Sequence, residues 1–479
     1  MKNSRAEAQL LSSVSAPAER VKESERSQPH LKTENAPLEV KVVTRETEFL
    51  MLRDEWEKLV EQCPVHVYQL FAWQWFWWKH YGTKFQLHII TFRRSGALVG
   101  IIPLFLQKYY VCHHGYSQRD NVMYSRLRML GCGIASKENR GLPAEYGPSD
   151  YLDIIVLPEN GVEVAKEFSA YLAAHADLFD EVHFQDVPQQ SALNKYIVPE
   201  LKKSHWECNV AEGEICPYLA APQSMEKYLD VHPNLRHRVN QVKKEFVAHP
   251  PFSIETIETW SSFASAYRDL VQLHQLRWNR LGYAGLFSDH RFTQFQSDVL
   301  SAFYKQRVLW FKAVRFAGVR IALRVGFIFK GRCYDYLSGF DDTAPGAKKS
   351  PSRALLLTMI ENAIQSKVRV VDFLRGTEQY KFELATGMAR NVDIHVFNPQ
   401  TRKTLRVMLY RLVRIVGKTG RRISDEWKLL SVQLYVHGAG KFLFMYIQLF
   451  VHRLTEKLFQ EKFAPADFPL SLENDNKQS

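Results

Sequence analysis

The residues best suited to chemistry lie between positions 334 and 381, where an aromatic segment, a basic turn and a charged segment follow one another. The basic side chains of the turn at 343–353 are Lys348, Lys349 and Arg353. We expect a helix over 354–367, with Ser350 or Ser352 as its N-cap. Free backbone N–H groups and the positive end of the helix dipole meet at a helix N-terminus. The turn therefore predicts a binding site for an anion such as phosphate.

Two strand-like segments flank this turn and helix, at 333–340 and 369–374. A right-handed crossover between them would make the strands parallel and bring Arg375 and Glu378 to the same sheet edge as the turn. Such an edge is where an α/β sheet binds its ligands. We therefore expect a single site that combines the turn with the charged residues after the second strand.

Several side chains near this edge can accept a proton; they are Glu378, Asp341, Asp372 and His274. Glu378 follows a glycine and should be open to solvent, so it is the preferred general base, with Asp341 next. Asp372 lies inside an apolar strand, where a carboxylate needs a partner, and Arg375 or Lys381 could be that partner. A buried ion pair explains Asp372 equally well, and a solvated loop carboxylate is the alternative for the other two acids.

His274, Arg277 and Trp278 share one face of a predicted helix, because they are spaced at i, i+3 and i+4. This face could line an acceptor pocket, with Arg277 contacting a carboxylate or phosphate and Trp278 stacking on a sugar or nucleotide. The alternative is that Trp278 belongs to the core and His274 is its neighbour. The tyrosines that could be either core aromatics or acceptor-site hydroxyls are Tyr334, Tyr336 and Tyr380.

Residues 225–396 resemble the catalytic half of the GNAT-type acetyltransferases grouped as the CelD/BcsL, or BioF-like, family, many of which are linked to cellulose and exopolysaccharide production. The matching blocks are Leu273, His274, Arg277 and Trp278 with Gly282, Gly285 and Phe287, then Tyr336, Gly339, Phe340 and Asp341, and finally DFLRGTEQYK at 372–381. Family members usually carry Ser-Pro-Gly at the start of the helix, whereas this chain has Ser352 at the third position. Gly346 is then the candidate for a close backbone approach to a cofactor phosphate.

The resemblance implies an acyltransferase that uses acetyl-CoA or another acyl-CoA and no metal, and that acts on an amine or hydroxyl of a sugar or envelope-linked acceptor. The implied cradle for the coenzyme phosphates is Gly346, Lys348, Lys349, Ser350, Ser352 and Arg353. Backbone N–H groups around 336–340 would face the thioester carbonyl. The implied acceptor-binding residues are His274, Arg277, Trp278, Tyr336, Arg375 and Lys381. A plain surface turn between helix and strand is the alternative for the cradle.

Two other functions stay open. The first is a Fem-like aminoacyl transferase that takes its donor from charged tRNA, which the net charge of +12 and a pI near 9.2 would suit. The second is a membrane-peripheral assembly factor for polysaccharide synthesis that has lost catalysis, in line with Ser352 in place of glycine. The sequence names neither the acceptor nor the oligomeric state.

The order of expected elements repeats along the chain. For the first copy these are helices at 46–63, 72–81, 161–175 and 192–203, a hairpin of 86–92 with 97–106, and strands at 151–156 and 181–186. For the second copy they are helices at 260–281 and 292–305 and a hairpin of 308–316 with 319–329, ahead of the segment described above. We therefore expect a mixed α/β fold of tandem GNAT-like units in a Fem-like layout. The expected parts are a disordered tail at 1–37, units at 38–222 and 223–399, basic helices at 400–463 and a second tail at 464–479.

The C-terminal segment, the cysteines and two incomplete motifs bear on where the protein acts and on which other functions it could have. The basic amphipathic segment 400–463 could pack on the body or contact a membrane surface, and no run of about 18 apolar residues is long enough to span a bilayer. The six cysteines show no CxxC spacing, which favours buried thiols in a reducing compartment, hence the cytoplasm or the inner face of its membrane. Other motifs are incomplete: Cys112-His113-His114 lacks metal-ligand spacing, and Gly417-Lys418-Thr419 lacks the first glycine of a phosphate-binding loop.

Overall fold

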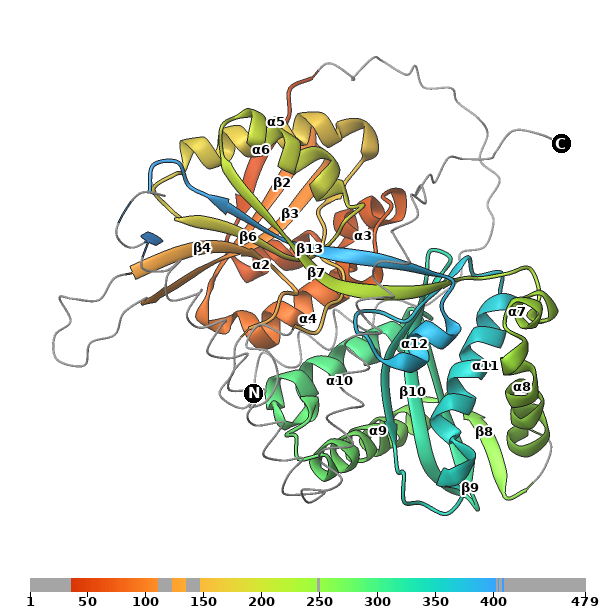
Figure 1. Ribbon diagram of the computed structural model, residues 1–479. Helices are drawn as coiled ribbons and strands as arrows, with labels where there is room; N and C mark the ends of the chain where they lie inside the picture. The colour runs from red at the N-terminus through yellow and green to blue at the C-terminus, as the bar shows by residue number, and fades with distance from the viewer. Residues whose placement is uncertain are drawn as a thin grey trace, which may run out of the picture. The chain divides into compact units, whose positions relative to one another are not determined.

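One continuous sheet organises the chain in the computed structural model, which describes residues 36–110, 123–134, 147–247, 250–401, 404 and 407–408 (Figure 1). We call residues 38–222 the first half and residues 223–399 the second half. The first half contains β1 (Glu39–Val43), α2 (Glu46–Met51), α3 (Arg53–Gln62), α4 (Phe71–Tyr81), β2 (Gln86–Arg94), β3 (Ala97–Tyr110), β4 (Met123–Met129), β5 (Ile155–Val156), α5 (Gly161–Ala174), β6 (Glu181–Pro188), α6 (Val198–Lys203) and β7 (Glu207–Ala220). The second half contains α7 (Met225–Val231), α8 (Arg236–Val242), β8 (Phe252–Thr256), α9 (Trp260–Arg280), α10 (His290–Lys305), β9 (Leu309–Phe316), β10 (Val319–Phe329), β11 (Arg332–Phe340), α11 (Pro351–Gln365), β12 (Val370–Asp372), α12 (Gln379–Leu384) and β13 (Gly387–Phe397).

The two halves of the sheet have the same strand arrangement when each is followed from its outer edge to the centre. From one edge it runs β1-β2-β3-β4-β6-β13, and from the other β8-β9-β10-β11-β12-β7. The last strand of each half has therefore crossed into the other half, and β7 and β13 lie side by side at the centre (Figure 1). In both halves one neighbouring pair is parallel, β4 with β6 and β11 with β12, and the remaining pairs are antiparallel. The expected tandem architecture is confirmed, with an exchange of strands that the sequence did not indicate.

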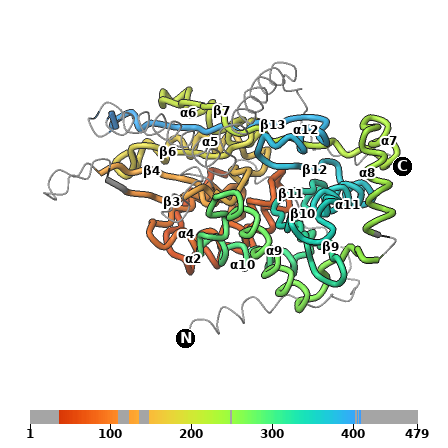
Figure 2. Tube along the Cα trace, turned by 60° about the horizontal axis from the view of Figure 1, so that its bottom comes forward, coloured from red at the N-terminus to blue at the C-terminus, as the bar shows by residue number. Residues whose placement is uncertain are grey.

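Helices cover both faces of the second half of the sheet. Leu323, Val325 and Phe327 of β10 pack in the same core as the buried face of α9. The intervening Gly326 faces α11, where an added Cβ would lie 2.6 Å from Met359. Figure 2 shows α11 along β10 and β11, with α8 on its outer side. The ends of α9 and α11 thus approach the same strand, β11, from opposite faces.

The tryptophan-rich helix α4 belongs to the first half but packs on the second. Trp73 is fully buried, and its ring lies 5.1 Å from Phe295 of α10 and 5.7 Å from Tyr336 of β11, measured between ring centroids. A helix that is apolar on all sides is typical of such a buried position. This contact explains the density of aromatic residues at 71–81.

Some expected elements differ from the observed ones. The helix expected at 46–63 is two helices that meet at Leu52. The strand expected at 151–156 is reduced to β5, because Asp153 instead accepts hydrogen bonds from the backbone N–H groups of Ala192 and Leu193. The carboxylate fixes the start of the following helical segment, and a residue used in this way draws the chain out of a strand ladder.

No helix within the described ranges is long and apolar enough to cross a membrane. Nor do the described residues contain a group of three potential metal ligands. Four of the described cysteines are buried: Cys63, Cys132, Cys216 and Cys333. The predictions for the tail at 1–35, for Cys112 to His114 and for most of 400–479 fall outside the described residues.

Candidate functional site

A cavity opens where β11 and β12 part. The two strands pair only from Arg332 with Val370 to Tyr334 with Asp372, after which β11 continues to Phe340 while β12 ends. The cavity that follows has a volume of about 540 Å³ and is lined by both diverging segments, at 335–338 and 373–375. The N-terminus of α11, the C-terminal part of α9 and residues 147–150 of the first half complete its wall. The parallel strands therefore create the expected site at one sheet edge.

A β-bulge lies in the wall of this cavity. Opposite β10, the register passes from Leu337 facing Val325 to Asp335 facing Gly326, so Tyr336 is the extra residue. The hydroxyl of Tyr336 donates to the carbonyl oxygen of Pro148 at 3.0 Å. Bulges of this kind re-aim side chains and backbone groups next to active sites. Tyr336, expected to bind substrate, lines the cavity, but its hydroxyl is hydrogen-bonded to a residue of the first half.

The turn before α11 divides into a part that lines the cavity and a part that does not. Ser350, Ser352 and Arg353 line it, whereas Gly346, Lys348 and Lys349 do not. Gly346 has a φ of +86°, and a Cβ there would lie 2.6 Å from the ring of Phe252, so its lack of a side chain serves packing.

Ser350 is the N-cap residue, as expected, but its φ of +57° leaves its side chain without a capping hydrogen bond. Ser352 also lines the cavity. Its hydroxyl accepts a hydrogen bond from Nη2 of Arg324 at 3.2 Å. Lys349 is drawn away from the cavity by Glu245, at 2.9 Å. The part of the turn that lines the cavity is therefore shorter than the expected phosphate cradle.

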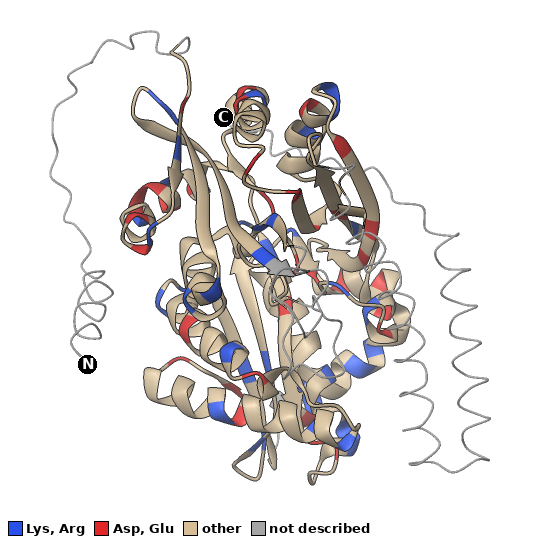
Figure 3. Ribbon diagram, turned by 90° about the vertical axis from the view of Figure 1, so that its left-hand side faces the viewer, with Lys and Arg blue, Asp and Glu red and all other residues tan. Residues whose placement is uncertain are grey.

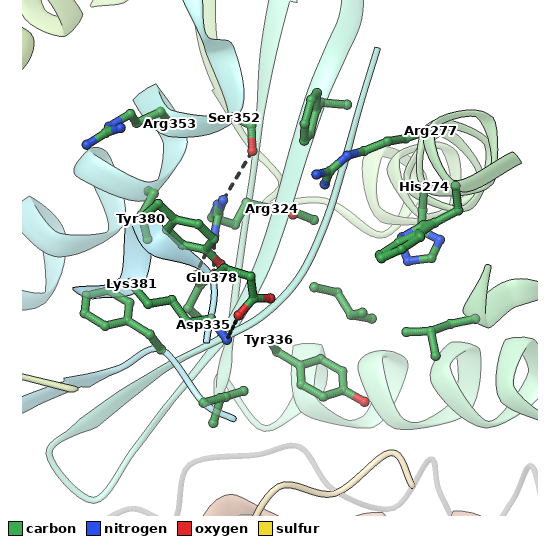
Figure 4. A pocket seen from close by; sticks show the side chains of 18 of the residues that line it. His274, Arg277, Arg324, Asp335, Tyr336, Ser352, Arg353, Glu378, Tyr380 and Lys381 are labelled. Atoms are coloured by element: carbon green, nitrogen blue, oxygen red, sulfur yellow. Dashed lines mark hydrogen bonds and ion pairs between the residues drawn. The ribbon is translucent and has the colours of Figure 1, made fainter. Parts of the chain in front are cut away.

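Helix α9 lies against β11 at Gly339. An added Cβ on Gly339 would lie 2.8 Å from the backbone nitrogen of His274, so only glycine permits this approach. Burial lowers the pKa of His274 to about 4, and its ring is therefore neutral at neutral pH. The guanidinium of Arg277 lies over the ring of Phe340, 4.4 Å from its centroid, and Figure 4 shows it pointing into the cavity. Trp278 also lines the cavity.

The charged end of the site is held by the first half. Arg375 is buried and its Nε lies 3.1 Å from a carboxylate oxygen of Asp150, while Nη1 lies 3.0 Å from Asp186. The backbone carbonyl of Arg375 in turn accepts a hydrogen bond from Nζ of Lys381 at 2.6 Å. Lys381 also pairs with Glu378 at 3.0 Å (Figure 4). The guanidinium of Arg375, predicted to bind substrate, is thus paired with two carboxylates of the first half, and its backbone carbonyl holds Lys381 in place.

The three acidic candidates for the general base differ in their surroundings. Glu378 lines the cavity and its side chain is 57% exposed. Asp341 also lines it, but the hydrogen bond from Arg280 and then that from Thr343 lower its pKa to about 2, which makes it a weak base at neutral pH.

Asp372 does not line the cavity. Its carboxylate forms an ion pair with Arg332 at 2.8 Å and accepts a hydrogen bond from the hydroxyl of Tyr151 at 2.9 Å. The prediction that Arg375 or Lys381 pairs with Asp372 is wrong, because both side chains lie beyond the end of β12 while Arg332 stands beside Asp372 on β11. The buried ion pair is thus the observed arrangement.

The sequence reasoning missed a buried ion pair in the cavity wall. Arg324 of β10 pairs with Asp335 of β11, and both side chains are less than 10% exposed (Figure 4). The hydroxyl of Tyr380 lies near this pair, and burial, followed by the charge of Asp335, raises the pKa of Tyr380 well above its usual range. The sequence signal for this ion pair was a single charged residue inside each of two otherwise apolar strands. A charged side chain is tolerated inside such a strand only when it has a partner of opposite charge.

The equivalent place in the first half is filled by the chain itself. Strand β5 folds back onto β3 beside the parallel pair β4 and β6, and the N–H of Leu152 donates to the carbonyl of Asp186 at 2.9 Å. At the start of α5, the ring of Tyr196 lies 2.5 Å from where a Cβ on Gly161 would stand. The helix N-terminus that corresponds to that of α11 is therefore covered by an aromatic ring.

Comparison with known proteins agrees with this geometry. Residues 233–382 match the family model described as an acetyltransferase (GNAT) domain. No curated protein matches the sequence.

Among solved structures, FemX superposes over 77% of this chain and 100% of its own, with a TM-score of 0.50 and 11% identity. A conserved protein of unknown function from Bacteroides thetaiotaomicron covers 74% of this chain and 100% of its own at a TM-score of 0.45 and 12% identity. A tandem GNAT protein from the clavulanic acid biosynthesis pathway covers 75% and 98% at a TM-score of 0.36 and 12% identity. The chain shares the fold of FemX, and its segment 233–382 is an acyltransferase domain of the GNAT type.

Proposed function

We propose that the protein transfers an acyl group, in the first instance acetyl, from coenzyme A to an amine or hydroxyl of a sugar or an envelope-linked saccharide. The observation that carries the proposal is the cavity between β11 and the segment after β12, with the N-terminus of α11 at one side. A helix N-terminus next to Arg353 suits the phosphates of the donor. The thioester then extends along the free edge of β11 toward the bulge at Tyr336.

The chemistry follows from the groups in the cavity wall. The acceptor nitrogen or oxygen attacks the thioester carbon, and Glu378 takes its proton. Backbone N–H groups of β11 stabilise the oxyanion. When the carbon–sulfur bond breaks, the leaving thiolate accepts a hydrogen bond from Tyr380, whose raised pKa keeps its hydroxyl protonated. The thiolate then takes, through solvent, the proton that Glu378 removed from the acceptor, which returns Glu378 to its charged form. Lys381 holds Glu378 at the cavity and Arg375 holds Lys381.

The proposed acceptor class and cellular location have separate support. The resemblance to the CelD/BcsL family favours a saccharide of cellulose or exopolysaccharide production, and Trp278 in the cavity wall provides a surface for a sugar ring. We place the reaction in the cytoplasm, where acyl-CoA is available. Contact with the membrane through 400–463 stays a prediction, because that segment lies outside the described residues.

Thermal unfolding with and without acetyl-CoA tests the proposal. A ligand at 100 times its Kd stabilises the folded state by about 2.7 kcal/mol, so Tm should rise with acetyl-CoA concentration. Arg353→Gln should reduce this rise, whereas Lys243→Gln should not, because Lys243 pairs with Glu361 outside the cavity lining. Mass spectrometry of the purified protein provides an independent check for co-purified acyl-CoA.

The alternative donor, an aminoacyl-tRNA, makes the opposite prediction in the same experiment. A protein that uses it would not respond to acetyl-CoA, and would bind tRNA with an affinity that falls steeply as salt is raised. That result would replace acyl-CoA as the donor while leaving acyl transfer in place.

A further inference from the structure

A buried row of charged side chains links the first half to Glu378. On the helices, charges of both signs lie close together, as Figure 3 shows. The row differs from these because four of its members, Asp150, Asp186, Arg375 and Lys381, are less than 10% exposed, whereas Glu378 at its end is 57% exposed. Replacing buried ion pairs by apolar residues of the same size often costs no stability. The row therefore points to a role beyond stability.

Asp186 is held by its own backbone. Its N–H donates to a carboxylate oxygen of Asp393 at 3.0 Å, and its carbonyl accepts the N–H of Leu152 at 2.9 Å. Its φ of +53° lies in the left-handed region, which residues other than glycine adopt rarely and which is found most often at functional sites. This backbone places the carboxylate 3.0 Å from Nη1 of Arg375, although Asp186 does not itself line the cavity.

The first half also fixes the backbone of Arg375. One carboxylate oxygen of Asp150 lies 3.1 Å from Nε of Arg375 and accepts the backbone N–H of the same residue at 3.3 Å. The next N–H, that of Gly376, donates to the carbonyl of Ile215 on β7 at 3.1 Å. Because a peptide group is planar, this bond sets the direction of the carbonyl of Arg375, which points the opposite way.

The carbonyl of Arg375 connects this arrangement to Glu378. It accepts a hydrogen bond from Nζ of Lys381 at 2.6 Å, and the same Nζ forms an ion pair with Glu378 at 3.0 Å. A Cβ on Gly376 would overlap the carboxylate of Glu378 and lie 2.8 Å from Nζ of Lys381, so only glycine lets the two side chains meet here. The position of the exposed carboxylate thus depends on residues of the other half.

We infer that Asp186 is a positioning residue for acyl transfer, which acts through Arg375 and Lys381 on the carboxylate of Glu378. Asp150 shares this role, but it also lines the cavity, so Asp186 gives the cleaner test. A general base must lie within hydrogen-bond reach of the proton that it takes, and a displacement of about 1 Å can lower the rate about 10²-fold. The inference rests on the proposed function, because it takes Glu378 as the base.

Kinetics of the full-length protein, with acetyl-CoA and glucosamine as probes, test the inference. Burial raises the pKa of Asp186 to about 7, so the assays are run above that pH, where the carboxylate is charged. Asp186→Asn should lower kcat by about 10- to 100-fold and leave KM for acetyl-CoA within about twofold, because Asp186 lies outside the cavity lining. In a Glu378→Gln background the same substitution should have no further effect on kcat.

Asp153→Asn is the matched control. Asp153 is another buried acid of the first half; it does not line the cavity, and its carboxylate accepts the backbone N–H groups of Ala192 and Leu193. Its replacement should lower Tm without changing kcat measured below that Tm. Lys381→Met breaks the last link without altering the first half, and it should lower kcat as Asp186→Asn does. This second variant decides the matter if Asp186→Asn does not fold.

Hydrogen exchange followed by mass spectrometry tests the same link without an activity assay. Exchange in the peptide that covers 375–381 should be faster in Asp186→Asn and unchanged in Asp153→Asn. Wild-type kcat in Asp186→Asn or Lys381→Met, an undiminished loss in the Glu378→Gln background, or unchanged exchange at 375–381 would overturn the inference. If exchange rises as expected but no acetyl transfer to glucosamine is detected, the proposed function fails for this acceptor, while the positioning of 375–381 by Asp186 stands.

Discussion

Gly339 fixes the distance between α9 and β11, and Gly339→Ala is therefore a sharp perturbation. The added Cβ would lie 2.8 Å from the backbone nitrogen of His274 and 2.8 Å from the backbone oxygen of Leu270. Backbone atoms cannot rotate away as a side chain can. To regain an ordinary contact of 3.4 Å, the helix and the strand must separate by about 0.6 Å, the difference between the two distances.

Overpacking of this kind costs about 1–3 kcal/mol of the free energy of unfolding. The φ of Gly339 is not in the left-handed region, so the cost is steric. The shift also moves Arg277 relative to Phe340, whose contact of 4.4 Å sets the position of the guanidinium. We therefore expect a loss of both stability and affinity for acetyl-CoA.

Urea unfolding and calorimetry of the same preparation measure the two effects. Gly318→Ala is the matched control: its φ is +85° and nothing lies within 4 Å of the added Cβ, so it carries a conformational cost of about 1 kcal/mol without a clash. It should leave acetyl-CoA binding unchanged. The reasoning is refuted if Gly339→Ala unfolds at the same urea concentration as the wild type, or if its loss of affinity is matched by Gly318→Ala.

Three further predictions concern the acidic residues and the C-terminal segment. Asp372→Asn should cost about 3–5 kcal/mol in urea unfolding, since it breaks an ion pair whose carboxylate is buried and leaves Arg332, 20% exposed, without its counter-charge. A neutral result would show that the pair is dispensable. The hydrogen bond from Arg320 lowers the pKa of Glu255 to about 2 from 4.5, so its contribution to stability is present above about pH 4.5 and is lost as the pH falls toward 2. Glu255→Gln should remove that part of the acid dependence in unfolding measured at several pH values. Glu378→Gln should lower kcat by about 10²–10⁴, measured below the Tm of the variant. Its Tm should also fall, because Lys381 is buried and loses its counter-charge. If the variant is silent in cells while deletion of the residues after 399 abolishes function, the protein acts there without Glu378 as base.

The part of the fold with a strong local signal could be predicted from the sequence. The hairpin β9–β10 follows from two alternating segments around Ala317-Gly318, and α11 from its cap and apolar face. Strands β7 and β13 were missed because both depend on partners far away in the sequence. Glu207–Ala220 contains a mixture of polar, glycine and proline residues that no local rule marks as a strand, and it pairs with β12 and β13.

The site was predictable to the extent that its residues are close in sequence. The helix face of His274 and Arg277 and the charged segment at 375–381 were found because their spacing is informative. The contributions of Asp150 and Asp186 were not, because they come from the other half through the fold. Arg324 was missed because a charge in a strand resembles an exposed position until its buried partner is known.

The exchange of β7 and β13 has a consequence for synthesis on the ribosome. Strand β7 is complete at Ala220, but its neighbours β12 and β13 end at Asp372 and Phe397. At roughly 5–20 residues per second, the nascent chain needs about 10–35 s to complete β13. Until β12 and β13 are made, both edges of β7 and one edge of β6 are uncovered. Exposed edges are templates for aggregation, so chaperone dependence should be high and neither half should fold when expressed alone. Co-expression of residues 38–222 and 223–399 as separate chains should restore the sheet if the exchange needs no covalent link.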